Sequence, residues 1–279
     1  MPIGAQRGWY GSTLLAFLIL LTAAAVPSHG PLPGPAPDVS HSATGSAPQF
    51  APAAHDDHGY RFVRVRYDDL DGRRRRRGAW ATDYPAAERH LHEAIERTTG
   101  MHVEGPPIVL DLTDERIFEH PVLYLTEPGY WQTNEEEVEM LRKYLDRGGF
   151  LMIDDFHDYG RGYVGPQWNN MYENVKRVFP DREPVELTAE HPVWSVYYDI
   201  DPDAAISTKN SGRGGWGQRF GPLDDVYYGV FDDDGRMMIG IFYNQDIGDG
   251  WEWPNRNLAD ASTVSFQMAI NFIIYALTH

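Results

Sequence analysis

The sequence predicts an α/β domain with a mostly parallel sheet, helices on both faces of that sheet and a late β-hairpin. Two patterns lead to this prediction. Short apolar runs alternate with segments whose apolar residues recur at helical spacing, which is typical of parallel βαβ units. Near the end of the chain, two strand patterns in residues 226–243 flank Asp233, Asp234 and Gly235, which indicates a hairpin turn.

The first half of the domain contains three predicted extended segments and one helix. Residues 61–67, "RFVRVRY", alternate between apolar and polar side chains and form the first predicted strand. Asp83 is the expected N-cap of a helix that ends at Gly100. Residues 108–112 are extended, and the apolar run 121–127 is typical of a strand buried on both faces. The buried face of the helix is expected to carry Ala87, Leu91, Ala94 and Ile95.

Besides the hairpin, the second half contains one predicted strand and three predicted helices. Thr133 and Glu136 form a capping-box pattern that opens a helix, and Gly148 is its expected stop. A strand at 150–154 and a helix near 167–179 follow. The predicted inner face of the capping-box helix is Val138, Leu141 and Leu145. The last helix is expected from about Ser262 to Leu277, with an apolar face of Phe266, Ile270, Ile273, Ile274 and Leu277.

The N-terminal residues are predicted to direct export. Residues 1–26 have the pattern of a signal peptide, with Arg7 before an apolar run and small residues at Ala23 to Ala25. The apolar run is shorter than the roughly 20 residues of a membrane-spanning helix, which favours cleavage over a permanent anchor. We therefore expect an exported protein, periplasmic or secreted, with an uncleaved N-terminal anchor as the alternative.

The rest of the chain divides into a tether and one domain. Residues 27–59 are rich in Pro, Ala and Gly without an apolar period, so they are predicted to form a disordered tether. Residues 60–279 are predicted to form a single α/β domain. The chain contains no cysteine, which excludes disulfides and thiol chemistry.

The charge of the chain restricts its partners. It carries 41 acidic and 24 basic residues, a formal net charge of -17, which disfavours nucleic acid. A polar small molecule, a glycan or an envelope protein fits better. Arg73 to Arg77 form the one dense basic run, which is typical of a solvated loop, with contact to an anionic partner or a lipid surface as the alternative.

Titratable side chains gather where the predicted strands end. Ligands of an open parallel sheet bind outside the carboxyl ends of its strands, because the loops converge there. Asp154 and Asp155 are adjacent in a strand and point to opposite faces, so both reach one ligand only if the strand has already turned. The candidate ligand-binding residues at this edge are Glu127, Trp131, Asp154, Asp155, His157, Asn244, Asp246, Asp249, Trp251 and Glu252.

Several chemistries fit these residues and others do not. Their carboxylates suit acid–base catalysis, a divalent cation, or simple capping of helices and loops. No Gly-x-Ser-x-Gly or His-Glu-x-x-His motif is present, and His90 and His92 are predicted to be surface residues. The Gly-x-Gly-x-x-Gly match at residues 160–165 does not directly follow a first strand, which argues against a nicotinamide cofactor.

A set of motifs in order along the chain resembles one bacterial family. They include "FVRVRY", "WATDYPAAE", "YLTEPGYW", "GGFLMIDDFH", "HPVWSVYYDID", "GIFYNQDIGDGWEW" and "INFIIYALTH". Together they resemble domain of unknown function 4159, over residues from about Tyr60 to His279. The resemblance implies a flavodoxin-like fold, similar to class I glutamine amidotransferase-like domains, and no assigned activity. The resemblance implies two further candidate ligand-binding residues, Trp80 and Asp83, which match the family's Trp-x-x-Asp-Tyr-Pro together with Tyr84 and Pro85. The family's Glu-Pro-Gly-x-Trp and Asp-Asp-Phe-His motifs match Glu127, Trp131, Asp154, Asp155, Phe156 and His157. Its last segment matches Asn244, Asp246, Gly248, Asp249, Trp251 and Glu252.

The sequence therefore predicts an exported envelope domain that binds a polar ligand or partner in an acidic, Trp-rich crevice. Two alternatives remain, a hydrolase of a glycan or another polar envelope substrate and a divalent-metal-binding domain. Whether the protein is an enzyme is left open, and a divalent cation is the one cofactor that the residues suggest.

Overall fold

The computed structural model describes residues 59–70, 78–158, 165–203 and 226–279. Three predicted segments lie outside these residues: the signal peptide at 1–26, the tether up to residue 58, and Arg73 to Arg77. The same holds for all but the last residue of the Gly-x-Gly-x-x-Gly match.

Seven strands form one mostly parallel sheet, in the order β3-β1-β4-β6-β9-β8-β7. The first five in that order pair in parallel, and β8 and β7 complete the sheet as antiparallel strands. Numbered along the chain, the parallel strands have the order 2-1-3-4-5, which is the flavodoxin-like order. The strands are β1 (Val63–Arg66), β3 (Ile108–Asp111), β4 (Val122–Thr126), β6 (Phe150–Phe156), β7 (Val185–Glu186), β8 (Val226–Phe231) and β9 (Met237–Tyr243).

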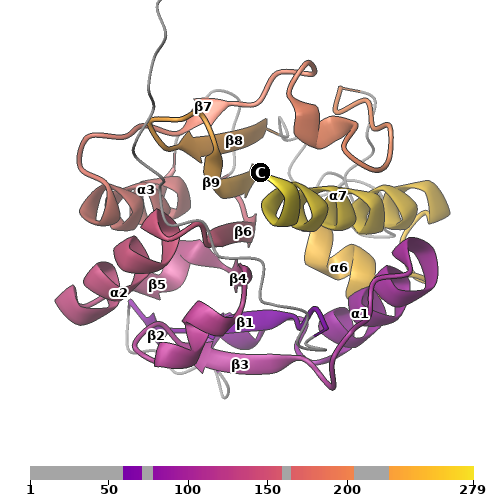
Figure 1. The fold of residues 1–279 in the computed structure, drawn as a ribbon, viewed down its shortest axis with the longest axis horizontal. Coiled ribbons are helices and arrows are strands. Elements are labelled where there is room, and N and C mark those ends of the chain that lie inside the picture. Colours follow the sequence, from indigo (N-terminus) through magenta and orange to yellow (C-terminus); the bar gives the residue numbers. More distant parts are fainter. Residues whose placement is uncertain (1–58, 71–77, 159–164, 204–225) are drawn as a thin grey trace, which may run out of the picture. The chain divides into compact units, whose positions relative to one another are not determined.

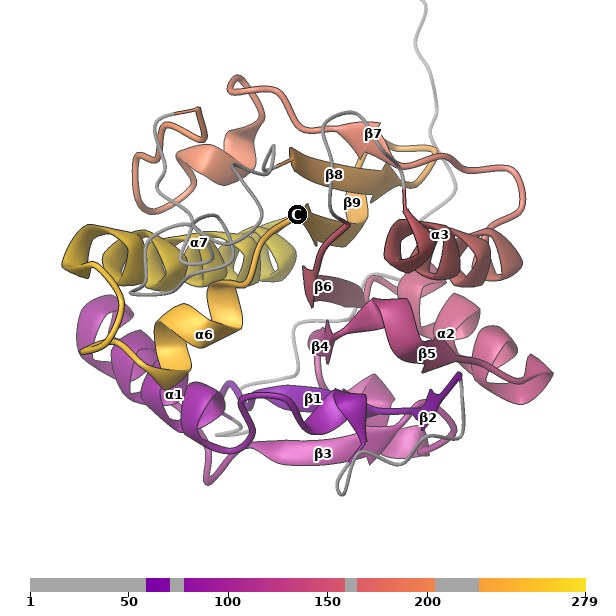
Figure 2. The same cartoon turned by 180° about the vertical axis from the view of Figure 1, so that it is seen from behind.

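Helices cover both faces of the sheet, as the sequence predicted (Figure 1). Along β6, Leu151 and Ile153 pack in one core with α2 and α3, whereas Phe150 and Met152 pack in a second core with α1, α6 and α7. Figure 2 shows α6 beside α1 and α7, on the far side of the sheet from α2 and α3. The helices are α1 (Ala86–Thr99), α2 (Glu135–Asp146), α3 (Pro166–Val178), α6 (Ile247–Glu252) and α7 (Ala259–Thr278).

Short elements join these layers. Strands β2 (Asp68–Asp69) and β5 (Trp131–Gln132) pair in a small antiparallel sheet. The 3-10 helices are η1 (Ala79–Ala81), η2 (Glu115–Glu119), η3 (Pro128–Tyr130) and η4 (Pro192–Trp194).

Two predicted helix starts are wrong. The capping box of α2 consists of Asn134 and Glu137, because the Thr133 hydroxyl is engaged by Asn174 at 2.6 Å. Asp83 is not the N-cap of α1. Pro85 occupies that position, and no side chain caps the helix. The predicted positions of α3 and of the hairpin strands β8 and β9 agree with the structure to within a few residues.

Among the described residues, α7 alone is long and apolar enough to cross a membrane by length and composition. In the fold, 56% of its apolar window is buried, and Phe272 and Ile273 lie in the second core. Buried helices in the cores of soluble proteins can be equally long and apolar, so the composition of α7 alone does not make it a membrane-spanning helix.

Candidate functional site

Unusual backbone conformations gather at the carboxyl edge of the sheet. Among the described residues, four that are not glycine have positive φ: Asp83 (64°), Glu127 (51°), Asp155 (58°) and Asn244 (59°). Glu127 follows β4, Asp155 lies near the end of β6, and Asn244 follows β9. Side chains other than glycine rarely adopt this conformation, and such residues cluster at functional sites. All four belong to the residues that the sequence singled out.

A β-bulge separates the two adjacent aspartates of β6. Ile153 pairs with Ile241 and Phe156 with Tyr243, so Asp154 and Asp155 together oppose one residue of β9. The positive φ of Asp155 fits a bulge in which one residue is left-handed. The strand therefore turns at Asp154 and Asp155. Such a turn is the condition, expected from the sequence, under which both acids can reach one ligand.

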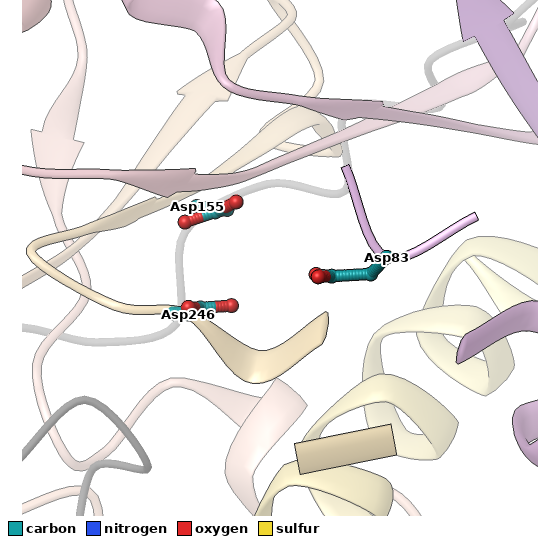
Figure 3. A group of neighbouring side chains, drawn as sticks. All are labelled: Asp83, Asp155 and Asp246. Atoms are coloured by element: carbon teal, nitrogen blue, oxygen red, sulfur yellow. The ribbon is translucent and has the colours of Figure 1, made fainter. Parts of the chain in front are cut away.

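Three carboxylates from distant parts of the chain meet beside this bulge. One oxygen from each of Asp83, Asp155 and Asp246 lies within 4.8 Å of the others. Figure 3 shows the Asp83 side chain directed toward the other two. These three residues are called the acidic cluster below. The segment between η1 and α1, the bulge of β6 and the start of α6 each supply one of them.

The environment of the acidic cluster disfavours three negative charges. Burial raises the pKa of Asp83 well above its usual range, and the charges of Asp246 and Asp155 raise it further. Burial and the charges of Asp155, Asp249 and Asp154 likewise raise the pKa of Asp246. The nearby carboxyl group of Glu252 raises the pKa of Asp83 as well. Oδ2 of Asp83 is buried and has no hydrogen-bond partner among the described residues.

Asp154 supports the acidic cluster from behind. Its carboxylate accepts hydrogen bonds from the Tyr124 hydroxyl at 2.8 Å and from the backbone N–H groups of Ile247 and Gly248 at 3.2 and 2.9 Å. Asp246 caps the same short helix by accepting from the backbone N–H of Asp249 at 2.9 Å. The fully buried Asp154 therefore fixes the start of α6, and with it the position of Asp246.

Gly248 allows this close approach. A Cβ at this position would lie 2.9 Å from both Oδ2 of Asp83 and the Tyr124 hydroxyl. Such a contact is shorter than side chains tolerate, so the backbone at residue 248 reaches the acids only because it carries no side chain.

The predicted tryptophans do not form a ring-lined crevice. Trp131 and Trp251 are fully buried, one in each core, and the Trp251 indole N–H donates to the carbonyl oxygen of Ser265 at 3.0 Å. Trp80 is half-buried against the first core. The tryptophans are buried rather than exposed because helices cover both faces of the sheet. Large aromatic side chains near the end of a strand then pack between the sheet and a helix.

The remaining predicted residues lie at the same edge with structural contacts. The Glu127 backbone N–H donates to the carbonyl oxygen of Asp154 at 3.1 Å, and Oδ1 of Asn244 accepts from the Asp158 N–H at 3.1 Å. Asp249 accepts from the Asn257 amide at 2.9 Å. The backbone N–H of His157 points to the Gln167 side chain at 3.4 Å. Glu127, His157 and Asp249 are not in the group of acidic and imidazole side chains that could share one ion, which among the described residues consists of Asp83, Asp155 and Asp246.

The prediction that both histidines of α1 lie on the surface is wrong. His92 is buried, and its Nε2 accepts from the backbone N–H of Phe62 at 2.8 Å. The half-buried His90 contacts the carbonyl oxygen of Trp251 through Nδ1 at 2.6 Å. Both residues tie α1 to its neighbours, because this helix is packed between β1 and α6.

Sequence reasoning missed Arg64, Glu88 and Tyr124. In "RFVRVRY", Arg64 points to the same face of the strand as the apolar Phe62, two residues earlier. Strand β1 lies between β3 and β4 in a sheet that is covered on both sides, so neither of its faces is exposed to solvent. Arg64 had therefore to be buried and paired, and Glu88 of α1 is its partner.

Comparison with known proteins gives one match. The sequence profile described as Domain of unknown function (DUF4159) matches residues 61–277. No curated protein matches the chain significantly.

Proposed function

The chain belongs to the family described as Domain of unknown function (DUF4159), and on that premise we propose that its acidic cluster binds a divalent cation. One observation carries this proposal. Oδ2 of Asp83 is buried and has no hydrogen-bond partner among the described residues, and the Asp83 side chain points toward Asp155 and Asp246 (Figure 3). An ionised carboxylate in that position needs a positive charge.

The geometry favours a hard cation with oxygen ligands. Ca²⁺ binds oxygens at about 2.3–2.6 Å, so two oxygens on opposite sides of it are roughly 5 Å apart. The three oxygens of the acidic cluster lie within 4.8 Å of one another and fit around one such ion. The same closeness argues against a glycosidase pair, whose carboxyls are about 5–9.5 Å apart with a sugar ring between them.

The cation is proposed to serve a binding domain of the cell envelope. Three protein carboxylates leave coordination positions of Ca²⁺ open, and a polar small molecule, a glycan or a partner side chain can fill them. The sequence pattern of residues 1–26 supports export. Hydrolysis of a polar envelope substrate at this ion is the alternative.

We further propose a relationship in fold to class I glutamine amidotransferase-like domains, supported by the motif resemblance and the strand order. The amidotransferase reaction is not part of this proposal. Those enzymes use a cysteine nucleophile, and this chain contains no cysteine.

Isothermal titration calorimetry of the folded protein with Ca²⁺, Mg²⁺ and Mn²⁺ tests the cation site. We expect one ion to bind per chain and Asp155→Asn to weaken binding at least tenfold with the fold retained. His157→Ala tests whether the neighbouring imidazole takes part. Asp158→Asn is the matched control, because Asp158 is also a buried acid near the end of β6 but accepts from Gln167 and Trp168 of α3. A parent protein that binds none of these ions at millimolar concentration would contradict the proposal.

A further inference from the structure

A buried arginine reaches the backbone segment that carries Asp83. Arg64 lies on β1 and is fully buried. Its Nη1 donates to the carbonyl oxygens of Trp80 and Thr82, each at 2.9 Å. Thr82 directly precedes Asp83, so one guanidinium nitrogen holds the chain immediately before the first acid of the cluster.

The guanidinium itself is held on two other sides. Its Nε forms an ion pair with Glu88 of α1, and both side chains are fully buried. Its Cζ lies 4.9 Å from the centre of the Tyr124 ring, and the hydroxyl of that ring donates to Asp154. Arg64 therefore connects α1, the loop before Asp83 and the residues behind the acidic cluster.

Stability alone does not explain a buried ion pair. Removing two charges from water costs about as much as their attraction returns, and apolar residues of similar size are often as stable. Arginine differs from such residues, and from lysine, in the rigid fork that holds several acceptors at fixed angles. Here the fork directs Nε to Glu88 and Nη1 to two carbonyl groups, which lie beside a residue whose φ of 64° a free loop would avoid.

We propose that Arg64 is the positioning residue of the cation site, an inference that rests on the proposed function. It holds the segment from Trp80 to Thr82 so that Asp83 stays in its left-handed conformation and faces Asp155 and Asp246. Without this contact the loop relaxes and the Asp83 carboxylate leaves the ion.

Three substitutions separate positioning from general stability. Arg64→Lys keeps the charge but loses the fork, and we expect Ca²⁺ affinity to fall about 10- to 100-fold, as for other residues that orient metal ligands. Glu88→Gln weakens the ion pair but keeps both carbonyl contacts, so affinity should stay near that of the parent. Arg142→Lys is the matched control, because Arg142 of α2 similarly donates to two carbonyl oxygens, those of Arg177 and Val178 at the end of α3.

Terbium luminescence gives a readout that a loss of stability does not produce. Tb³⁺ replaces Ca²⁺ at oxygen sites, and its emission lifetimes in H₂O and D₂O report the number of metal-bound waters. We expect Tb³⁺ to bind more water molecules in Arg64→Lys than in the parent. Their number should equal that measured in Asp83→Asn. Glu88→Gln and Arg142→Lys should match the parent at a temperature where all variants are folded.

The outcomes distinguish the inference from the proposed function. A parent protein that binds neither Ca²⁺ nor Tb³⁺ refutes the cation site, and the role of Arg64 with it. Parent binding together with unchanged affinity and lifetimes in Arg64→Lys refutes the role of Arg64 alone. If Arg64→Lys does not fold, the double substitution Arg64→Met with Glu88→Met removes both buried charges, and it should fold and show the same loss of affinity.

Discussion

Replacing Asp246 by asparagine changes the charge of the acidic cluster while it keeps the local hydrogen bonding. The Asp246 side chain caps α6 by accepting from the Asp249 N–H at 2.9 Å, and the asparagine oxygen accepts the same bond. The substitution therefore removes one negative charge and keeps this cap.

The structure sets the size of the effect. Two unit charges 4.8 Å apart repel by about 3 kcal/mol at an effective dielectric constant of 20. Partial protonation relieves some of this repulsion, since burial and nearby charges raise the pKa of Asp83 and Asp246. We expect Asp246→Asn to increase the free energy of unfolding of the cation-free protein by about 1–3 kcal/mol at pH 7.5. For a domain of this size that is an increase in Tm of roughly 2–4 °C for each kcal/mol.

The assay is thermal unfolding followed by circular dichroism, in EDTA and in Ca²⁺. At about 100 times its Kd the ion should stabilise the parent by about 2.7 kcal/mol, and most of this gain should be lost in Asp246→Asn. Asp158→Asn should instead lower Tm and keep the Ca²⁺ response, because it weakens contacts to α3 and Tyr243. The reasoning is refuted if Asp246→Asn melts below the parent in EDTA and both proteins respond equally to Ca²⁺.

Two further predictions concern stability. Burial lowers the pKa of His92 from 6.5 to about 4, so between these values the unfolded chain binds a proton that the folded protein does not. The free energy of unfolding should therefore fall by up to about 3 kcal/mol as the pH decreases across that window. His92→Gln keeps an acceptor for the Phe62 N–H but does not titrate. In urea titrations at pH 4–7, its free energy of unfolding should lack the pH dependence that His92 causes. Gly240→Ala places a Cβ 2.8 Å from Phe272 and 3.1 Å from Phe150, so it should cost about 1–3 kcal/mol by overpacking and leave Ca²⁺ affinity unchanged. A urea midpoint equal to that of the parent would show that α7 packs less closely on β9 than described.

The sequence predicted the fold because each strand and helix has a local signal. The run 121–127 is apolar throughout since β4 is covered on both faces, and the hairpin turn is marked by Gly235. Where two local signals compete, sequence is not sufficient. "TNEEE" contains two overlapping capping boxes, and contact with Asn174, far along the chain, decides between them.

The candidate site was predictable only in part. The rule for parallel sheets places acids that follow strands at one edge, which explains why Asp155 and Asp246 were singled out, whereas Asp83 was singled out only by the family resemblance. It does not show which way a side chain turns. Asp83 resembles a helix cap in sequence and joins the acidic cluster only because its φ is positive. The burial of Trp131 and Trp251 likewise depends on packing between layers that no short segment encodes.

The wide separation of the three acids along the chain has a consequence for biogenesis. Asp83 and Asp246 lie near opposite ends of the domain, and Asp246 is held by the start of α6, which follows the last strand of the sheet. A nascent chain that has not yet delivered this strand has an incomplete acidic cluster. An ion bound as proposed above would therefore be acquired only after the sheet has closed, and its occupancy would report that folding is finished.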